Sequence, residues 1–455
     1  MKEKKLFDAI TGVPDEMVDE AGKTRLKKDA FAAKRWTALA ACIALIAGLL
    51  WLVPSGSGSA QALLEVKYPQ ARGFEDYEAL HKTVDANPVE ESFITGINEF
   101  SYETGAQILS RGEGNQNYSP LSLYYALSFA ASGAKGETQQ ELLDLLKVSD
   151  MKLLSKQASN LYRRIYSDNK IGSLKIANSL WMDKNVGWER SFVENAAKNF
   201  FASIYSVDFK DENTPKDMAQ WVSDNTKGTL SPEMAISPEQ ILSIINTVYF
   251  YDEWVDKFDK SATAEDEFHL ANGETVKCDF MNSRYASAGF CKGEGFTRSS
   301  LPLKNSGSMV FILPDEGVSV QKLLESPEKL KAAFEGGEQG HGQVVWQIPK
   351  FSFGTKYDLK ESLKALGVEN IFEENADFSG ITGEMAFVSG IRQETHIAID
   401  ENGVEASAFT QIDYCGAAQP QGRADMILNR PFIFGITAPT GTLLFIGVCE
   451  NPTQS

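Results

Sequence analysis

The amino-acid sequence predicts a large α+β domain. Segments with helical periodicity occur early in the chain, and most strand-like segments occur later. The two kinds do not alternate regularly, which argues against a βαβ repeat and favours separate helical and sheet layers. The chain has 455 residues, of which 43% are hydrophobic and 11% aromatic, so it can bury a large core.

Three early segments have the spacing of apolar residues that is typical of helices. They are 92–109, 121–134 and 137–147. Ser119 stands directly before Pro120, and this pair is a common helix start because proline lacks an N–H that the first helical turn leaves unused. We therefore expect the second helix to open at this pair.

Apolar or alternating runs predict strands in the later part of the chain. These runs are 173–182, 241–250, 308–314, 343–354, 396–400, 426–436 and 443–450. Between the runs 396–400 and 426–436 lie about 25 residues that begin ENGVEASAF and carry few charges. Connections of that length inside a compact domain are uncommon and usually functional.

Composition and motifs exclude several classes of function. The net charge of −18 argues against nucleic acid as a partner, because phosphates require clustered Lys and Arg. The five cysteines form no CxxC pair, and the four histidines have no metal-ligand spacing. HExxH, GxSxG and Walker motifs are missing from the sequence. The sequence therefore indicates no catalytic site, no metal and no cofactor.

The N-terminal residues form a separate unit with membrane character. Residues 1–35 end in a basic stretch, and residues 36–53 are free of charge. Eighteen helical residues span about 27 Å, close to the roughly 30 Å of a bilayer core. The basic flank predicts a cytoplasmic N-terminus and a single-pass anchor, with the rest of the chain outside the cell. Two alternatives are a signal cleaved near 60–62, which would secrete the protein, and a lipoprotein box at 39–42.

Residues 54–88 follow this span as a tether and a mixed stretch that the pattern leaves unassigned. The tether reads SGSGSAQA, which is typical of a flexible linker. We expect one large domain over residues 89–455.

Eight segments of that domain together resemble the serpin family, in order and at similar spacing. They are YSPLSLYYALSFAASGAKGET (118–138), IANSLWMD (176–183), WVSDNTKGTL (221–230), IINTVYFYDEWVDKF (244–258), IPKFSFGTKYDLKESLKALG (348–367), ADFSGIT (376–382), MILNRPFIFGI (426–436) and GVCENP (447–452). The resemblance implies a serpin fold with three β-sheets, about nine helices and an exposed reactive-centre loop. It also implies suicide inhibition of serine proteases, in which the cut loop enters the main sheet, and it implies no enzyme activity.

The polar segment after residue 400 resembles the hinge of that loop. The hinge residues are Glu401, Gly403, Val404, Glu405, Ala406, Ser407 and Ala408. Strand alternation from Val404 places Val404, Ala406, Ala408, Thr410, Ile412 and Tyr414 on the inward face, where none carries a charge. This composition suits a segment that later becomes a strand.

The resemblance also implies a scissile bond and a class of target. Seventeen positions counted inclusively from Glu401 place the bond between Ala417 and Ala418, whereas counting back from Pro431 gives about Pro420. A small residue such as Ala417 suits an elastase-like serine protease. A subtilisin-like protease is an alternative target, and a cysteine protease is another. We expect a monomer.

Four further positions match residues that control opening of the sheet in the family. Ser119 and Asn178 match positions of the shutter, and Trp254 matches the tryptophan of the breach, where insertion starts. Gln393 stands where relatives usually carry His, and glutamine can still donate and accept hydrogen bonds. An alternative interpretation is a non-inhibitory binding protein of the same fold, because Val404 and Phe409 depart from the usual hinge residues.

Overall fold

The structure, a computed structural model, describes residues 60–237, 239–305, 307–404 and 422–454. These residues belong to one compact unit, Gly58–Ser455. The predicted basic segment 1–35 and the predicted span 36–53 lie outside the described residues. Among the helices that are described, none has the length and apolar character needed to cross a bilayer.

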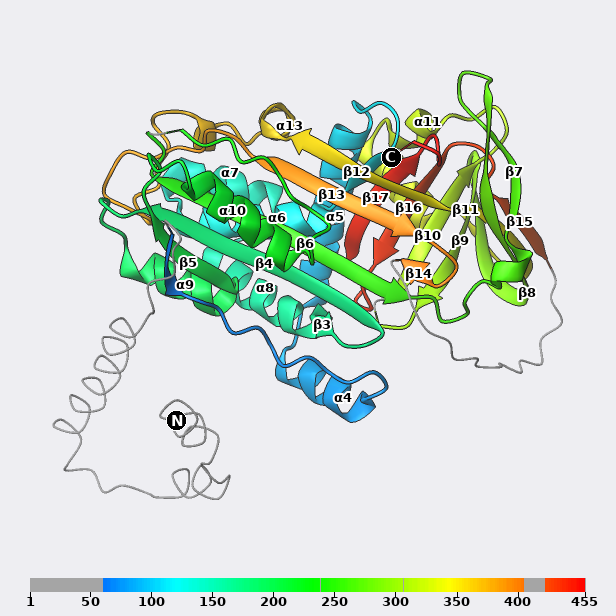
Figure 1. The fold of residues 1–455 in the computed structure, drawn as a ribbon, viewed down its shortest axis with the longest axis horizontal. Coiled ribbons are helices and arrows are strands. Elements are labelled where there is room, and N and C mark those ends of the chain that lie inside the picture. The colour runs from blue at the N-terminus through cyan, green and yellow to red at the C-terminus, as the bar shows by residue number, and fades with distance from the viewer. Residues whose placement is uncertain (1–59, 238, 306, 405–421, 455) are drawn as a thin grey trace. The chain divides into compact units, whose positions relative to one another are not determined.

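The strands form two hydrogen-bonded sheets, and the first contains the main functional features (Figure 1). Its strand order is β1-β5-β4-β6-β14-β13-β12, with β3 paired to β4. The strands are β1 (Gln61–Leu64), β3 (Ser167–Asp168), β4 (Gly172–Asp183), β5 (Ala202–Val207), β6 (Leu242–Glu253), β12 (Phe351–Asp358), β13 (Arg392–Ile399) and β14 (Gly403–Val404).

The second sheet has the order β15-β11-β8-β9-β10-β16-β17-β2, with β7 paired to β8. Its strands are β2 (Gln116–Tyr118), β7 (Ala264–His269), β8 (Thr275–Gly293), β9 (Phe296–Leu303), β10 (Gly307–Pro314), β11 (Glu338–Pro349), β15 (Arg423–Ile427), β16 (Phe432–Thr437) and β17 (Leu443–Cys449). The long strand β8 pairs with β11, β7 and β9, so these four strands belong to one hydrogen-bonded network. Three expected sheets therefore occur as two hydrogen-bonded networks.

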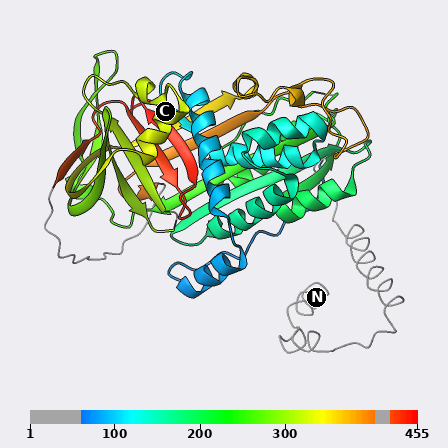
Figure 2. The ribbon, with the colours of Figure 1, turned by 180° about the vertical axis from the view of Figure 1, so that it is seen from behind.

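The helices lie mainly on one face of the first sheet, as the view from behind shows (Figure 2). They are α4 (Tyr77–Ala86), α5 (Glu91–Leu109), α6 (Pro120–Gly133), α7 (Gly136–Leu145), α8 (Met151–Ile165), α9 (Arg190–Asn199), α10 (Thr214–Asn225), α11 (Val320–Leu324), α12 (Pro327–Glu335) and α13 (Lys360–Ala365), with short 3₁₀ turns at Lys260–Ala262 and Asn370–Phe372. Nine of these α-helices lie in the described part of 89–455, which agrees with the expected number.

Helix α10 lies on the opposite face of the first sheet from α6 (Figure 1). It covers a separate apolar cluster that includes Trp181, Trp221 and Leu230. The chain that follows α10 continues across this face towards β6. The first sheet is therefore enclosed between helices on both faces.

Most expected elements are confirmed, and two expected strands are each divided. The run expected as one strand over 426–436 is β15 and β16, which residues 428–431 separate. The single strand expected over 343–354 is two strands, because the chain leaves the second sheet at Pro349 and enters the first at Phe351. Pro349 has no backbone N–H to continue a ladder, and the N–H of Lys350 donates to Asp279 O at 2.8 Å. The α+β class and the helix at Ser119–Pro120 are confirmed, and the Ser119 side chain caps that helix by accepting from Ser122 N.

Residues 60–88, which the sequence leaves unassigned, belong to the same body as the sheets. Strand β1 pairs antiparallel with β5 at the edge of the first sheet. Tyr68 stacks on Tyr166 with ring centroids 6.0 Å apart, and the guanidinium of Arg72 donates to Arg164 O at 3.1 Å. The last residues of the predicted tether, 60–62, therefore pack against the domain, and Gln61 and Ala62 belong to β1.

Candidate functional site

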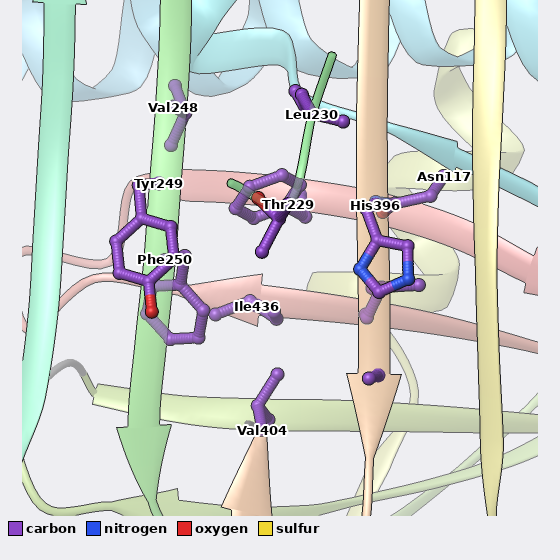
Figure 3. A pocket seen from close by; sticks show the side chains of 12 residues that line it. Asn117, Thr229, Leu230, Val248, Tyr249, Phe250, His396, Val404 and Ile436 are labelled. Carbon is purple, nitrogen blue, oxygen red and sulfur yellow. The ribbon is translucent and has the colours of Figure 1, made fainter. Parts of the chain in front are cut away.

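The candidate site is a slot between β6 and β13, two parallel strands of the first sheet. At its mouth β14 pairs with both: Val404 is opposite Asp252 of β6 and Ile399 of β13. Beyond Val404 no ladder joins β6 to β13 within the described residues. Figure 3 shows Val404 at the lower end of this gap, with β6 and β13 on either side. A hydrogen-bonding edge of each strand therefore faces an unfilled position in the sheet.

Next to Val404 the slot holds a cavity of about 30 Å³ (Figure 3). Its walls are Val248 and Phe250 of β6 and Ile397 of β13, and Phe445 of the second sheet lines its floor. Leu230, from the chain after α10, lines it as well. The volume is that of about one water molecule, so this part of the slot is nearly closed by apolar side chains.

The inner face of the slot is uncharged along β13. Its buried side chains alternate with more exposed ones, and the buried set is Gln393, Thr395, Ile397 and Ile399. Because strand residues alternate between faces, a strand added in register with Val404 would send every second residue to this inner face. Small or apolar side chains fit there.

Ser119 and Gln393, both predicted shutter residues, are hydrogen-bonded to each other beneath the sheet. Ser119 N donates to Gln393 Oε1 at 2.9 Å, and Gln393 Nε2 donates to Ser119 O at 2.9 Å. Ser119 Oγ also donates to Leu444 O at 2.7 Å. Glutamine therefore joins β13 to the start of α6 at the position where relatives usually have His.

Asn178, the third predicted shutter residue, lies in a separate chain of hydrogen bonds. Its Nδ2 donates to Phe200 O at 2.6 Å, and its Oδ1 accepts from Asn246 Nδ2 at 2.6 Å. Asn246 in turn accepts from the hydroxyl of Ser122. The sequence analysis missed Asn246 and Ser122. The signal was an asparagine within the otherwise apolar run ILSIINTVYF, where a buried amide needs partners.

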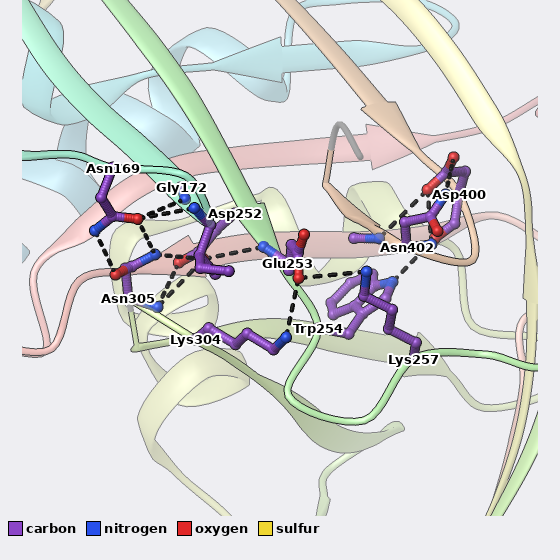
Figure 4. A network of polar contacts seen from close by, with 12 residues as sticks. Asn169, Gly172, Asp252, Glu253, Trp254, Lys257, Lys304, Asn305, Asp400 and Asn402 are labelled. Atoms are coloured by element: carbon purple, nitrogen blue, oxygen red, sulfur yellow. Dashed lines mark hydrogen bonds and ion pairs between the residues drawn. The ribbon is translucent and has the colours of Figure 1, made fainter. Parts of the chain in front are cut away.

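Trp254, the predicted breach residue, is buried beside the turn that leads into the hinge (Figure 4). Its indole Nε1 donates to Asp400 O at 2.9 Å, and its backbone N donates to Asn402 O at 3.1 Å. The Asp400 carboxylate in turn accepts from the backbone N–H of Asn402 at 2.8 Å. The tryptophan thus holds the turn that delivers Gly403 and Val404 to the slot.

Glu401, the first hinge residue, is buried and paired. Its Oε1 lies 3.2 Å from Lys350 Nζ and accepts from Thr263 Oγ1 at 2.9 Å. Burial by itself raises the pKa of this carboxyl, but hydrogen bonds from its own backbone, Thr263 and Lys350, with the Lys350 charge, lower the pKa below its usual value. Glu401 therefore stays ionised and anchors the base of the hinge.

A second charged cluster, which the sequence analysis missed, lies at the end of β6 (Figure 4). Glu253 is fully buried and pairs with Gly403 of β14. Its Oε2 lies 2.9 Å from Lys304 Nζ and 3.3 Å from Lys257 Nζ. The adjacent Asp252 accepts from the N–H of Asn305 at 2.9 Å. These contacts hold the strand end against which the first hinge residues pair.

Some predicted site residues cannot be placed. Residues Glu405, Ala406, Ser407, Ala408, Ala417 and Ala418 lie outside the described residues. Of the hinge, Glu401, Gly403 and Val404 are described, and all three are buried. In the described part of the chain no group of His, Cys, Asp and Glu could hold a metal ion.

Comparison with known proteins gives a consistent result. The family model described as "Serpin (serine protease inhibitor)" matches residues 95–452. Serpin-Z7 of Hordeum vulgare is 32% identical over 368 residues, which cover 75% of this chain and 91% of that protein.

Solved structures agree with the sequence matches. The native state of tengpin, a thermophilic serpin, has a TM-score of 0.73 and 28% identity, covering 86% of this chain and 100% of tengpin. A complex of thyroxine-binding globulin with thyroxine has a TM-score of 0.68 and covers 79% of this chain and 99% of the globulin. At 24% identity, the globulin shows the fold alone.

Proposed function

Because this chain belongs to the serpin family of serine protease inhibitors, we propose that it inhibits a serine protease as a suicide substrate. The protease serine attacks the Ala417 carbonyl carbon, and the bond to the Ala418 nitrogen breaks. The nitrogen takes a proton and leaves as a new amino terminus, while Ala417 stays joined to the protease as an ester. The loop then inserts between β6 and β13 and carries the protease with it before water hydrolyses the ester.

One observation carries this proposal. Gly403 and Val404 already pair with β6, and Val404 also pairs with β13, while the two strands share no ladder beyond them in the described residues. Strand addition satisfies the backbone groups on both sides of such a slot. The native sheet therefore lacks a strand that the loop can supply.

The register of β14 predicts which loop residue would pair with which residue of β6 and β13 after insertion. Continuing the pairs Val404–Asp252 and Val404–Ile399 places residues 404–414 along β6 and residues 404–411 along β13. In that register Ala406 and Ala408 lie opposite the buried Ile397 and Thr395. The small hinge residues would therefore occupy the inner face, as the sequence pattern predicts.

The target that fits best is an elastase-like protease, since Ala417 suits a small primary pocket. A subtilisin-like protease is the second candidate. The experiment is a denaturing gel of the full chain mixed with an elastase, with mass analysis of the peptide released. A stable band at the mass of the protease joined to the chain up to Ala417, together with a released peptide that begins at Ala418, supports the proposal.

Melting the cleaved protein gives an independent measurement. Insertion adds a strand to the first sheet, so cleavage should raise the melting temperature sharply. Cleavage that produces neither a covalent band nor a rise in melting temperature would contradict inhibition. That result would favour the alternative, a binding protein of the same fold, which Val404 and Phe409 at unusual hinge positions support.

We also propose that the domain acts outside the cell, anchored by residues 36–53. The support is the sequence alone: an uncharged run of eighteen residues after a basic flank. Protease added to intact cells should remove the domain. A domain that stays intact until the cells are lysed would contradict this location.

A further inference from the structure

We infer that the end of the slot far from Val404, beside the start of β6, is a binding site for a long-chain carboxylate, such as a fatty-acid anion. The site is a cavity of about 330 Å³, separate from the small cavity next to Val404. Small-molecule pockets typically have volumes of about 300 to 1,000 Å³. The cavity is therefore large enough for a ligand rather than only for water.

The walls of the cavity are mainly apolar and come from three directions. Helix α6 contributes Ala126 and Leu127, and the start of β6 contributes Leu242 and Ile244. Residues 385–391, just before β13, form a third wall. An alkyl chain is the ligand chemistry that matches these walls, because its burial removes apolar surface from water on both sides.

Two large apolar side chains at the rim of the cavity are exposed to solvent. Met385 is 72% exposed and Phe387 is 48% exposed, and both line the cavity. Large exposed apolar side chains that gather at one opening indicate a binding site. An alkyl chain that enters here would also cover these two side chains.

The anionic group of the ligand is inferred from Arg392, which lines the same cavity. Its side chain is exposed and makes no ion pair or hydrogen bond in the described residues. Asp358 is its cross-strand neighbour, but that carboxylate accepts from the backbone N–H of Lys360 at 3.2 Å. Arginine can bind a carboxylate through two parallel hydrogen bonds.

The other charged group on the cavity is Glu239, which has its own partner. Its carboxylate accepts from the hydroxyl of Ser237, and this hydrogen bond lowers its pKa, so it is ionised at neutral pH. Glu239 disfavours a second anion near it. The carboxylate of the ligand is therefore expected at Arg392, with the alkyl chain extending towards α6.

The expected effect of the ligand on protease inhibition rests on the proposed function. The β14 register places loop residues 410–414 beside β6 residues 246–242, and all of these strand residues except Ile245 line the cavity. An inserted loop and a bound alkyl chain would occupy the same space. The ligand would then convert the inhibitor into an ordinary substrate by blocking the last part of insertion.

Photolabelling tests the site on the full chain in lipid nanodiscs. The probe is a twelve-carbon carboxylate with a diazirine in its chain, and mass analysis maps the labelled peptides. We expect labels on residues 385–391 and 122–130. Arg392→Gln should reduce carboxylate labelling there about fivefold, the upper end of what one exposed ion pair contributes. Arg284→Gln, which removes an exposed arginine of β8 away from the cavity, should leave it unchanged.

The alcohol of equal chain length separates the anion site from a general apolar pocket. The alcohol should label the native protein more weakly than the carboxylate does. The substitution Arg392→Gln should not change labelling by the alcohol. Equal labelling by carboxylate and alcohol would overturn the assignment of an anion. Labels spread over other peptides would overturn the site. The substitution Ala126→Leu should fill the cavity and reduce the labelling. Unchanged labelling in this variant, with a normal melting temperature, would also overturn the site.

Cleavage of the loop separates this inference from the proposed function. If the cut loop inserts, labelling of the cavity should disappear in the cleaved protein. Labelling that persists after cleavage supports the ligand site and contradicts insertion to this depth. A covalent protease complex without any labelling of the intact protein supports inhibition and overturns the ligand site.

Discussion

Gln393 and Ser119 exchange two hydrogen bonds of 2.9 Å, one in each direction, between β13 and the start of α6. Both residues are buried. The side-chain amide of Gln393 thus satisfies the backbone N–H and C=O of Ser119, which would otherwise be buried without these partners. This contact crosses the inner face of the slot, so it affects both folding and opening.

We expect Gln393→Ala to lower the free energy of unfolding by about 1–3 kcal/mol, because it leaves the buried backbone N–H of Ser119 unpaired, whereas the Ser119 carbonyl still accepts from Leu123 N. Urea denaturation at neutral pH measures the change. Gln220→Ala, which removes an exposed glutamine of α10, is the matched control and should change it by less than about 0.5 kcal/mol. Equal effects of the two substitutions would contradict a role for the pair.

The buried charge cluster at Glu253 predicts a larger loss. Glu253→Gln leaves Lys304 and Lys257, whose side chains are 6% and 10% exposed, without their shared carboxylate. Breaking a buried pair in this way costs about 3–5 kcal/mol. The comparison in urea is Glu325→Gln, which breaks an exposed pair with Lys329 and should cost at most about 1 kcal/mol. A small loss for Glu253→Gln would mean that water reaches the two lysines.

Glu401 predicts a dependence of stability on pH. Its folded pKa lies below the usual value of 4.5. The contribution of Glu401 to the free energy of unfolding is therefore fully present above its pKa in the unfolded chain. This contribution is lost as the pH falls through the lower pKa of the folded protein. Urea midpoints measured below pH 5 should fall less steeply in Glu401→Gln than in the native protein. Parallel curves would contradict the lowered pKa.

Hinge residues alternate between the inner and outer faces of the sheet after insertion. We therefore predict that a charge introduced on the inner face abolishes inhibition and that one on the outer face does not. Ala406→Glu places a carboxylate opposite the buried Ile397 on insertion, so we expect at least a tenfold fall in the fraction of protease trapped, about 1.4 kcal/mol. Ser407→Glu carries the same charge to the outer face and should retain inhibition. A gel of covalent complex against cleaved product measures both. Loss of inhibition in both variants would contradict the register.

Local features of the fold were predictable because their causes are local. The start of α6 follows from Ser119 and Pro120, and the alternation in β13 follows from one buried face. The break at Lys350 was missed because the residues on both sides of Pro349 suit strands, and only tertiary pairing shows that they belong to different sheets.

The site was predictable only in part, for a similar reason. Ser119, Asn178, Gln393 and Trp254 were named through resemblance to family segments, and the structure gives each of them hydrogen-bond partners. The partners themselves come from distant parts of the chain. Lys304 is 51 residues from Glu253, and Lys350 is 51 residues from Glu401. No periodicity in the sequence reports contacts over such separations.

Strand β1 has a consequence for self-association. It pairs with β5, which would otherwise be the outermost strand of the first sheet and would present its backbone groups to solvent. An uncovered strand of this kind is a template for pairing with another molecule. Residues 61–64 therefore protect this margin of the sheet from joining a second copy, and a chain shortened past Leu64 should aggregate at lower concentration than the intact one.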